Sequence, residues 1–209
     1  MLANRGPGRF VVIEGLDGAG STTQIKLLAQ RLCATRPVFV THEPSDGPAG
    51  LQIRMVLERR VQMDQAALAA LFAADRMDHL FHRDGEGGIV AHLERGVDVL
   101  TDRYYLSSFA YQGMSLDWEW IWHMHRHCVR PDVTAFVDVP VEVCLERIAR
   151  GRGHVDLFEN RRALTRARES YMRAIERLRA QGERIEVLDG DRPLEEVREA
   201  VWEVARGPL

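Results

Sequence analysis

The chain has 209 residues, of which 45% are hydrophobic and 28% charged, the composition of an ordinary soluble globular domain. Its net charge of −3 argues against a nucleic-acid partner, because proteins that grip a phosphate backbone usually carry a basic excess. Three widely spaced cysteines, a start without a signal-peptide pattern and the lack of a long apolar run favour a cytoplasmic protein with no membrane partner.

Short apolar runs alternate with helical patterns along the chain. We expect strands at 10–14, 37–41, 97–101, 133–139 and 184–188. Helices are expected at 21–33, 49–60 and 64–82, in a segment ending at 96, from 104 onward, and at 141–150, 159–181 and 193–205. This alternation predicts an α/β protein with a parallel sheet covered on both faces. We expect residues 1–209 to form one domain, with a lid segment at about 150–160.

A glycine-rich turn lies between the first predicted strand and helix. Its residues are Gly15, Leu16, Asp17, Gly18, Ala19, Gly20, Ser21, Thr22 and Thr23. They follow the P-loop template, G-x-x-x-x-G-K-[ST], in which backbone N–H groups and a helix N-terminus hold phosphate. We expect the turn to bind ATP and the Thr22 hydroxyl to ligate Mg²⁺. Taken alone, the turn also fits a strand–helix connection that binds no nucleotide.

The turn departs from the template at Ser21, which stands where the template has a lysine. That lysine normally places a positive charge on the β- and γ-phosphates. Lys26 is the only lysine of the chain, and it follows Ser21 by five residues. Five residues are about 500° of rotation and about 7.5 Å of rise along a helix, so we do not expect Lys26 to reach the phosphates. Arginines of the lid are the expected source of charge.

A polar motif, Thr101-Asp102-Arg103-Tyr104-Tyr105, follows the third predicted strand. Polar residues at the carboxyl end of a parallel strand face the ligand crevice of such folds. Asp102 can hold Mg²⁺ through water, and the guanidinium of Arg103 can form two hydrogen bonds with a phosphate. The two residues alone also fit an ion pair at a helix start.

Longer strings of residues resemble the thymidylate kinase family. The strings are Asp102-Arg103-Tyr104 with Ser107, Ser108, Ala110, Tyr111, Gln112 and Gly113; Thr41-His42-Glu43-Pro44; Phe72-Ala73-Ala74-Asp75-Arg76; Arg130-Pro131-Asp132; Asp156-Leu157-Phe158-Glu159; and Asp189-Gly190-Asp191-Arg192-Pro193. They occur in the family's order and cover nearly the whole chain.

The resemblance implies a substrate pocket built from residues of three motifs. It assigns Asp17 to the sugar 3′-hydroxyl, Phe72 to stacking on thymine, Arg76 to reading the base and Arg103 to the acceptor phosphate. It places Tyr104 beside the deoxyribose and lines the base pocket with Ser107, Ser108 and Gln112. Without the resemblance, Phe72 more often indicates core packing, and Arg76 a surface ion pair with Asp75 or Asp78.

The resemblance also implies an activity and an architecture. The activity is ATP-dependent phosphorylation of dTMP to dTDP with Mg²⁺, by a homodimer whose small-molecule substrates are ATP and dTMP. The architecture is a P-loop NTPase three-layer sandwich with a central five-stranded parallel sheet.

Three positions carry no fixed positive charge where the family has one: Ser21, His42 and Leu157. We expect lid arginines, Arg150 and Arg152, to replace the lost charge and to act in catalysis together with Asp17 and Arg103. Two alternatives remain open. The chain can be a catalytically weak nucleotide-binding homologue, or a kinase for another nucleoside monophosphate.

Overall fold

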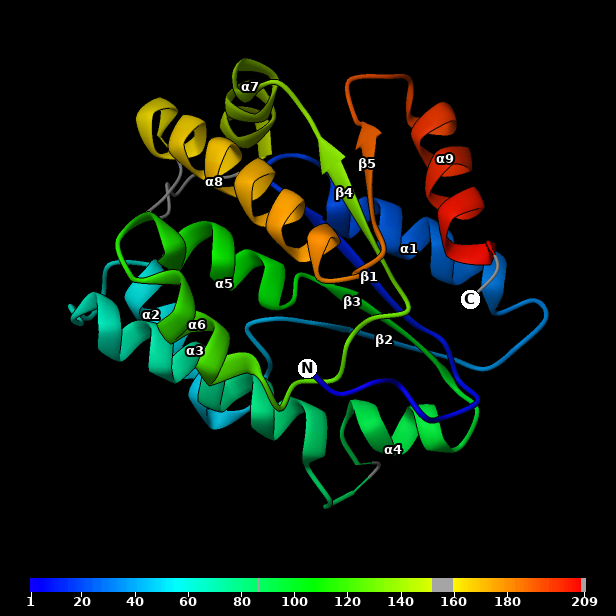
Figure 1. The fold of residues 1–209 in the computed structure, drawn as a ribbon. Helices are drawn as coiled ribbons and strands as arrows, with labels where there is room; N and C mark the ends of the chain where they lie inside the picture. Colours follow the sequence, from blue (N-terminus) through cyan, green and yellow to red (C-terminus); the bar gives the residue numbers. More distant parts are fainter. Residues whose placement is uncertain (86, 152–159, 208–209) are drawn as a thin grey trace.

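A computed structural model describes residues 1–85, 87–151 and 160–207. Its centre is one parallel sheet with the strand order β2-β3-β1-β4-β5 (Figure 1). The strands are β1 (Phe10–Gly15), β2 (Val38–His42), β3 (Asp98–Asp102), β4 (Val133–Asp138) and β5 (Ile185–Asp189). Each predicted strand is confirmed to within one residue at either end. The fold is the expected P-loop NTPase α/β sandwich.

The helices lie on both faces of this sheet. Their bounds are α1 (Ser21–Leu32), α2 (Pro48–Leu57), α3 (Gln65–Phe81), α4 (Ile89–Glu94), α5 (Tyr105–Tyr111), α6 (Trp118–His125), α7 (Val141–Gly151), α8 (Arg161–Ala180) and α9 (Leu194–Arg206). Helices α1 and α9 pack together on one face, whereas α5 and α8 form a pair on the other (Figure 1). Helix α3 contacts α2, α4 and α6.

The central strands are buried on both faces, which explains their continuous apolar runs. Every residue of β1 is buried, and so are all residues of β4 except Asp138. Phe10, Ile13 and Phe136 are among the largest fully buried side chains. One buried residue of β1, Glu14, is charged, and its role belongs to the site described below.

The helix expected from Tyr104 onward is interrupted between α5 and α6, which was not predicted from the sequence. The expected helix from Tyr104 ends at Tyr111, and a short 3-10 turn, Gln112–Met114, follows. Helix α6 then starts anew because the Asp117 carboxylate accepts a hydrogen bond from the backbone N–H of Trp120 at 3.0 Å. This restart turns α6 back toward α3.

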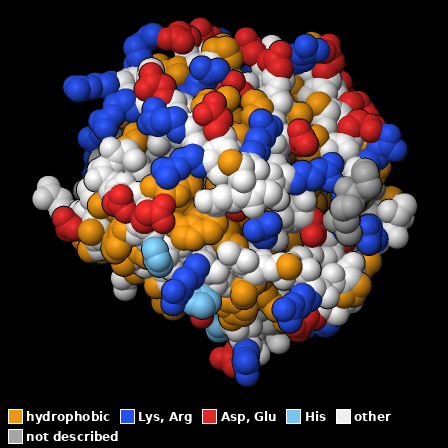
Figure 2. Space-filling view, viewed as in Figure 1, with side chains coloured by type: hydrophobic (Ala, Val, Ile, Leu, Met, Phe, Trp, Pro, Cys, Tyr) orange, Lys and Arg blue, Asp and Glu red, His pale blue; other side chains and the backbone are white. Residues whose placement is uncertain are grey.

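The surface carries both signs of charge. Figure 2 shows acidic and basic side chains interspersed over one face of the molecule, in keeping with the small net charge of −3. Within the described part of the chain, no helix combines the length and the apolar character needed to cross a membrane.

The sheet order fixes where a ligand can bind. Strand β1 lies between β3 and β4, so the connections after β1 and β3 leave the sheet at the same carboxyl edge. Such a reversal of strand order opens a crevice outside the strand ends. The glycine-rich turn after β1 and the Asp102-Arg103 pair after β3 both lie at this crevice.

Candidate active site

The glycine-rich turn has the backbone conformation of a phosphate-binding loop. Gly18 and Gly20 adopt φ values of 82° and 93°, which favour glycine because a Cβ atom is disfavoured in the left-handed region. A Cβ atom on Gly18 would also lie 2.5 Å from the carbonyl oxygen of Cys144 on α7. The turn is therefore held against α7, and α1 starts directly behind it at Ser21.

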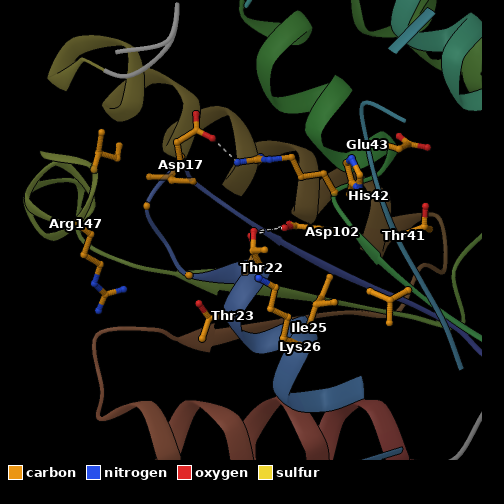
Figure 3. Close-up of a pocket in the computed structure, with 17 residues that line it drawn as sticks. Asp17, Thr22, Thr23, Ile25, Lys26, Thr41, His42, Glu43, Asp102 and Arg147 are labelled. Carbon is orange, nitrogen blue, oxygen red and sulfur yellow. Dashed lines mark hydrogen bonds and ion pairs between the residues drawn. The ribbon is translucent and has the colours of Figure 1, made fainter. Parts of the chain in front are cut away.

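Two hydroxyls of α1 meet a carboxylate at the end of β3. The Ser21 Oγ donates to Asp102 Oδ1 at 2.7 Å, and the Thr22 hydroxyl donates to Asp102 Oδ2 (Figure 3). Pairing of β1 with β3 brings these elements together. Oxygen ligands of this kind suit Mg²⁺, and the assignment of Thr22 and Asp102 to a magnesium site stays a prediction. The serine in the lysine position is thus bonded to the proposed metal-binding carboxylate.

A cavity of about 770 Å³ opens over this turn. Among its lining residues are Asp17, Gly18, Gly20, Ser21, Thr22, Thr23, Lys26, His42, Asp102, Arg103 and Arg147. Of the predicted P-loop residues, Gly15 and Ala19 are buried and do not line the cavity, and the others do.

Arg147 is a cavity residue that the sequence analysis missed. It lies on α7, and its guanidinium donates to the carbonyl oxygen of Ala19 at 3.2 Å. Arg147 could have been found from the predicted order of elements, because α7 follows β4, whose carboxyl end lies at the same edge of the sheet as the glycine-rich turn.

Neither of the two predicted lid arginines is seen at the cavity in the described part of the chain. Arg150 lies at the exposed end of α7, pairs with Glu146 at 3.3 Å and is not among the residues that line the cavity. Arg152 and Leu157 fall outside the described residues, as does most of the predicted lid. The catalytic assignment of Arg150 and Arg152 therefore stays a prediction.

Arg103 is the best-anchored cation of the crevice. Its Nη2 contacts Asp17 Oδ1 at 2.7 Å, and its Nη1 donates to the Tyr171 hydroxyl of α8 at 3.0 Å. Burial opposes its charge, but the Asp17 carboxylate and nearby tyrosines outweigh burial and raise the pKa of Arg103. Its φ of 69° is a left-handed backbone conformation that costs about 1–2 kcal/mol in a residue other than glycine.

The buried Glu14 carboxylate holds this strained turn in place. It accepts hydrogen bonds from the backbone N–H groups of Tyr104 at 2.8 Å and Ser107 at 3.1 Å. It also accepts from the hydroxyls of Ser107 at 2.6 Å and Tyr171 at 3.0 Å. Burial raises the pKa of Glu14, although Arg103 and these donors act in the opposite direction. Glu14 was not predicted as a site residue, although a charged residue within an apolar strand is an unusual feature of the sequence.

A second cavity of about 260 Å³ adjoins the first. It is lined by Phe72, Arg76, Tyr104, Ser107, Ser108 and Gln112, with Pro44, Arg54, Leu57 and Tyr111. All the residues that the resemblance assigned to the acceptor thus lie around one cavity. Asp17, His42, Glu43 and Arg103 line both cavities, so the two spaces meet at these side chains.

Arg76 is fully buried at the base of the second cavity. It contacts Glu43 Oε2 through Nη2 at 2.6 Å and donates to Ser108 Oγ at 3.0 Å. Its Nη1 also lies 3.2 Å from His125 Nε2, and its guanidinium lies over the Tyr104 ring at 5.3 Å. The alternative of a surface ion pair is wrong, because Arg76 is only 1% exposed.

The Arg76 cluster includes a histidine that the sequence analysis did not assign. Burial, together with repulsion from Arg76, holds the pKa of His125 well below its usual 6.5. Glu43 attracts Arg76 strongly enough to outweigh burial, so the pKa of Arg76 is raised. The cluster therefore keeps a charged arginine, which lines the cavity, beside a neutral buried histidine.

His42 replaces a family arginine at the boundary between the cavities. Its ring lines both spaces, is about half exposed and lies 3.6 Å from Asp46. His42 is thus the histidine among the described residues that lines both cavities.

The fold and these two cavities define a P-loop protein of the nucleoside monophosphate kinase type. A glycine-rich turn, with the Thr22 hydroxyl bonded to the Asp102 carboxylate, lies on one side, and a smaller cavity with aromatic and hydroxyl side chains lies on the other. A family model described as thymidylate kinase matches residues 13–201. The chain belongs to the thymidylate kinase family.

Curated relatives agree with this assignment. A thymidylate kinase of Carboxydothermus hydrogenoformans is 34% identical over 94% of this chain and 95% of its own length. A thymidylate kinase of Rhodopirellula baltica is 31% identical over 96% of this chain and 81% of its own. A Treponema pallidum protein, described provisionally as a thymidylate kinase, is 41% identical over 78% of this chain and 76% of its own.

Proposed function

We propose that this protein transfers the γ-phosphoryl group of ATP to dTMP, forming ADP and dTDP. The observation that carries the proposal is the meeting of two cavities at Asp17, His42 and Arg103. One cavity lies over a glycine-rich turn suited to a triphosphate, and the other has the size and lining of a nucleoside site. Membership of the thymidylate kinase family supports the same pair of substrates.

The smaller cavity is proposed to hold dTMP. Phe72 would stack on the thymine ring, with Arg76, Ser108 and Gln112 at the polar edge of the base. Tyr104 and Ser107 lie near the sugar, and Asp17 would accept a hydrogen bond from the 3′-hydroxyl. Arg103 would bind the acceptor phosphate, because a guanidinium forms two parallel hydrogen bonds with phosphate oxygens.

The larger cavity is proposed to hold ATP. The backbone N–H groups of the turn from Gly15 to Thr23 and the N-terminus of α1 would bind its phosphates. Thr22 and Asp102 would hold Mg²⁺, which when bound neutralises part of the charge on the β- and γ-phosphates. Arg147, Arg150 and Arg152 are the arginines on or next to α7 that we propose to act near the transferred group.

The reaction requires positioning more than proton transfer. An oxygen of the dTMP phosphate forms the new bond to the γ-phosphorus of ATP, while the bond to the β,γ-bridging oxygen breaks and ADP leaves. The attacking phosphate is already anionic, so no general base is needed. Asp17 and Arg103 would align acceptor and donor, and the lining cations would stabilise charge on the transferred group.

Two further properties rest on the family alone. We propose that the protein acts as a homodimer and in the cytoplasm. Sedimentation velocity at micromolar protein, with and without dTMP, measures the first property directly.

An acceptor comparison tests the proposed substrate. ADP formation from ATP and Mg²⁺ is measured with dTMP, dUMP, dCMP or dGMP at equal concentration, against a control without acceptor. We expect dTMP to give the highest kcat/KM, as membership of the thymidylate kinase family implies, and dGMP a low value, because a cavity of this small volume fits a pyrimidine better than a purine. A preference for dGMP or dCMP would replace dTMP by another nucleoside monophosphate, and ADP formation independent of acceptor would contradict kinase activity.

A further inference from the structure

The larger cavity lacks the lysine of the P-loop template, but another lysine lines it. Ser21 occupies the template position, and its hydroxyl is bonded to Asp102. Lys26, the only lysine of the chain, lines the same cavity. In the sequence, Lys26 was not expected to reach the phosphates because it lies on a different side of the helix from Ser21.

The neighbour that matters is Thr22, which precedes Lys26 by four residues on α1. Residues four apart lie on one helical face, separated by about 6 Å of rise. Helical side chains lean toward the N-terminus, so a long side chain covers the turn before its own Cα atom. Figure 3 shows the Lys26 side chain running along α1 toward Thr22, with its amine at the cavity.

The other described cations of this cavity are already engaged. Arg103 pairs with Asp17 at 2.7 Å, and Arg147 donates to the Ala19 carbonyl at 3.2 Å. His42 lies at the far side of the cavity, near Asp46. Among the residues that the structure describes, none forms an ion pair or hydrogen bond with the exposed Lys26 amine. Lys26 is therefore a flexible point charge with room to meet an anion.

We propose that the Lys26 ammonium binds the phosphates of ATP and supplies, from one turn further along α1, the charge that Ser21 cannot. A lysine acts on phosphate as a point charge on a flexible four-carbon stem, so it can serve from a neighbouring position as long as the stem spans the gap. The inference rests on the proposed ATP site but does not depend on the identity of the acceptor.

Selective acetylation of amines provides the first test. An amine-acetylating reagent can modify the side chain of Lys26, the only lysine in this sequence, and an N-terminal amine. Peptide mass spectrometry reports the two modifications separately. We expect ATP with Mg²⁺ to slow acetylation of Lys26 at least about tenfold, since a nearby phosphate favours the charged ammonium, which is not a nucleophile. Inorganic tripolyphosphate should protect similarly, whereas adenosine and dTMP should not. The N-terminal amine serves as the internal control.

Kinetics with matched variants provide the second test. Lys26→Ala should lower kcat/KM for ATP by about 10- to 100-fold, the usual effect of losing one hydrogen bond to a charged group. The KM for dTMP should stay unchanged. Arg31→Ala is the control, because it removes a positive charge from α1 that pairs with Glu199 outside the cavity. Restoring the template in Ser21→Lys with Lys26→Ala should recover most of the lost rate.

Both tests must agree. Acetylation of Lys26 at the same rate with and without ATP or tripolyphosphate would overturn the inference, and so would wild-type kcat/KM in Lys26→Ala. If the protein turns over no nucleotide at all, the acetylation test still decides whether Lys26 binds phosphate. A failure of the proposed kinase activity is thereby separated from a failure of this inference.

Discussion

At the scale of single residues, Arg76 combines a buried ion pair with a place in the proposed substrate cavity. It forms a buried ion pair with Glu43 and lies in the floor of the smaller cavity. Removing one member of a buried pair leaves the other charge without compensation, which is far costlier than losing an exposed pair.

We therefore expect Arg76→Ala to lower the free energy of unfolding by about 3–5 kcal/mol. Arg60→Ala is the control, because its pair with Glu58 is exposed and such pairs contribute less than about 1 kcal/mol. Urea denaturation measures both. Adding Glu43→Gln to Arg76→Ala should recover part of the loss. A loss no greater than that of the control would contradict the buried pair.

His125 gives the molecule a predictable response to acid. Its pKa in the folded state lies well below 6.5, because it is buried and faces the Arg76 cation, with Cys128 Sγ at 3.9 Å as its other polar neighbour. Below pH 6.5 the His125 imidazole binds a proton in the unfolded chain but stays neutral in the folded protein. The stability linked to His125 is thus present above pH 6.5 and falls by about 1.4 kcal/mol per pH unit below it.

Guanidinium denaturation at pH 6.5 and 5.5 tests this response. In His125→Gln the fall in stability between the two pH values should be smaller than in the wild type by about 1 kcal/mol, because the unfolded histidine is already half protonated at pH 6.5. His123→Gln, two residues away on α6 and exposed, should keep the fall of the wild type. Equal falls in all three proteins would show that His125 does not resist protonation.

At the scale of elements, the glycine-rich turn packs closely against α7. Gly18→Ala and Gly182→Ala place a side chain at nearly equal φ, 82° and 83°. The Cβ atom of the first would lie 2.5 Å from the Cys144 carbonyl oxygen, whereas nothing lies within 4 Å of the second.

Gly182→Ala should therefore cost only the backbone strain, about 1–2 kcal/mol. Gly18→Ala should cost more and should also weaken ATP binding, because the turn must shift away from α7. Denaturant titration and calorimetry with ATP measure the two effects. Equal losses of stability with unchanged ATP affinity would refute the proposed packing of the turn.

The elements themselves were largely predictable because their signals are local. The buried strands β1 and β4 are short apolar runs, and the glycine-rich turn is marked by its own residues. The end of α5 was not predicted, since nothing in Tyr111 or Gln112 forbids a further helical turn. The restart of α6 depends on the Asp117 cap.

The site was predictable only where the motifs carried it. The acceptor residues Phe72, Arg76 and Ser108 lie around one cavity as the resemblance implied. Glu14 and Arg147 were missed because their roles exist only once β1, α5 and α7 are packed together. His125 was likewise hidden, because its partner Arg76 lies 49 residues earlier in the chain.

At the scale of the whole molecule, the sheet order brings the two cavities to one edge. The larger cavity is lined by the turn after β1 and by α1, and the smaller cavity by α3 and α5, with Arg103 after β3 lining both. Asp17 and Arg103 join the two, so each substrate would preorganise part of the site for the other. This shared boundary is the structural basis of the proposed transfer between two bound nucleotides.

The most direct test of this account is dTDP formation from dTMP and ATP with Mg²⁺, followed by chromatography of the nucleotides. The account predicts dTDP and ADP in equal amounts at a turnover on the order of 1–100 per second. Binding of dTMP seen by calorimetry without any dTDP would contradict it, and would mean that the lost charges at Ser21 and His42 leave a nucleotide-binding protein without kinase activity.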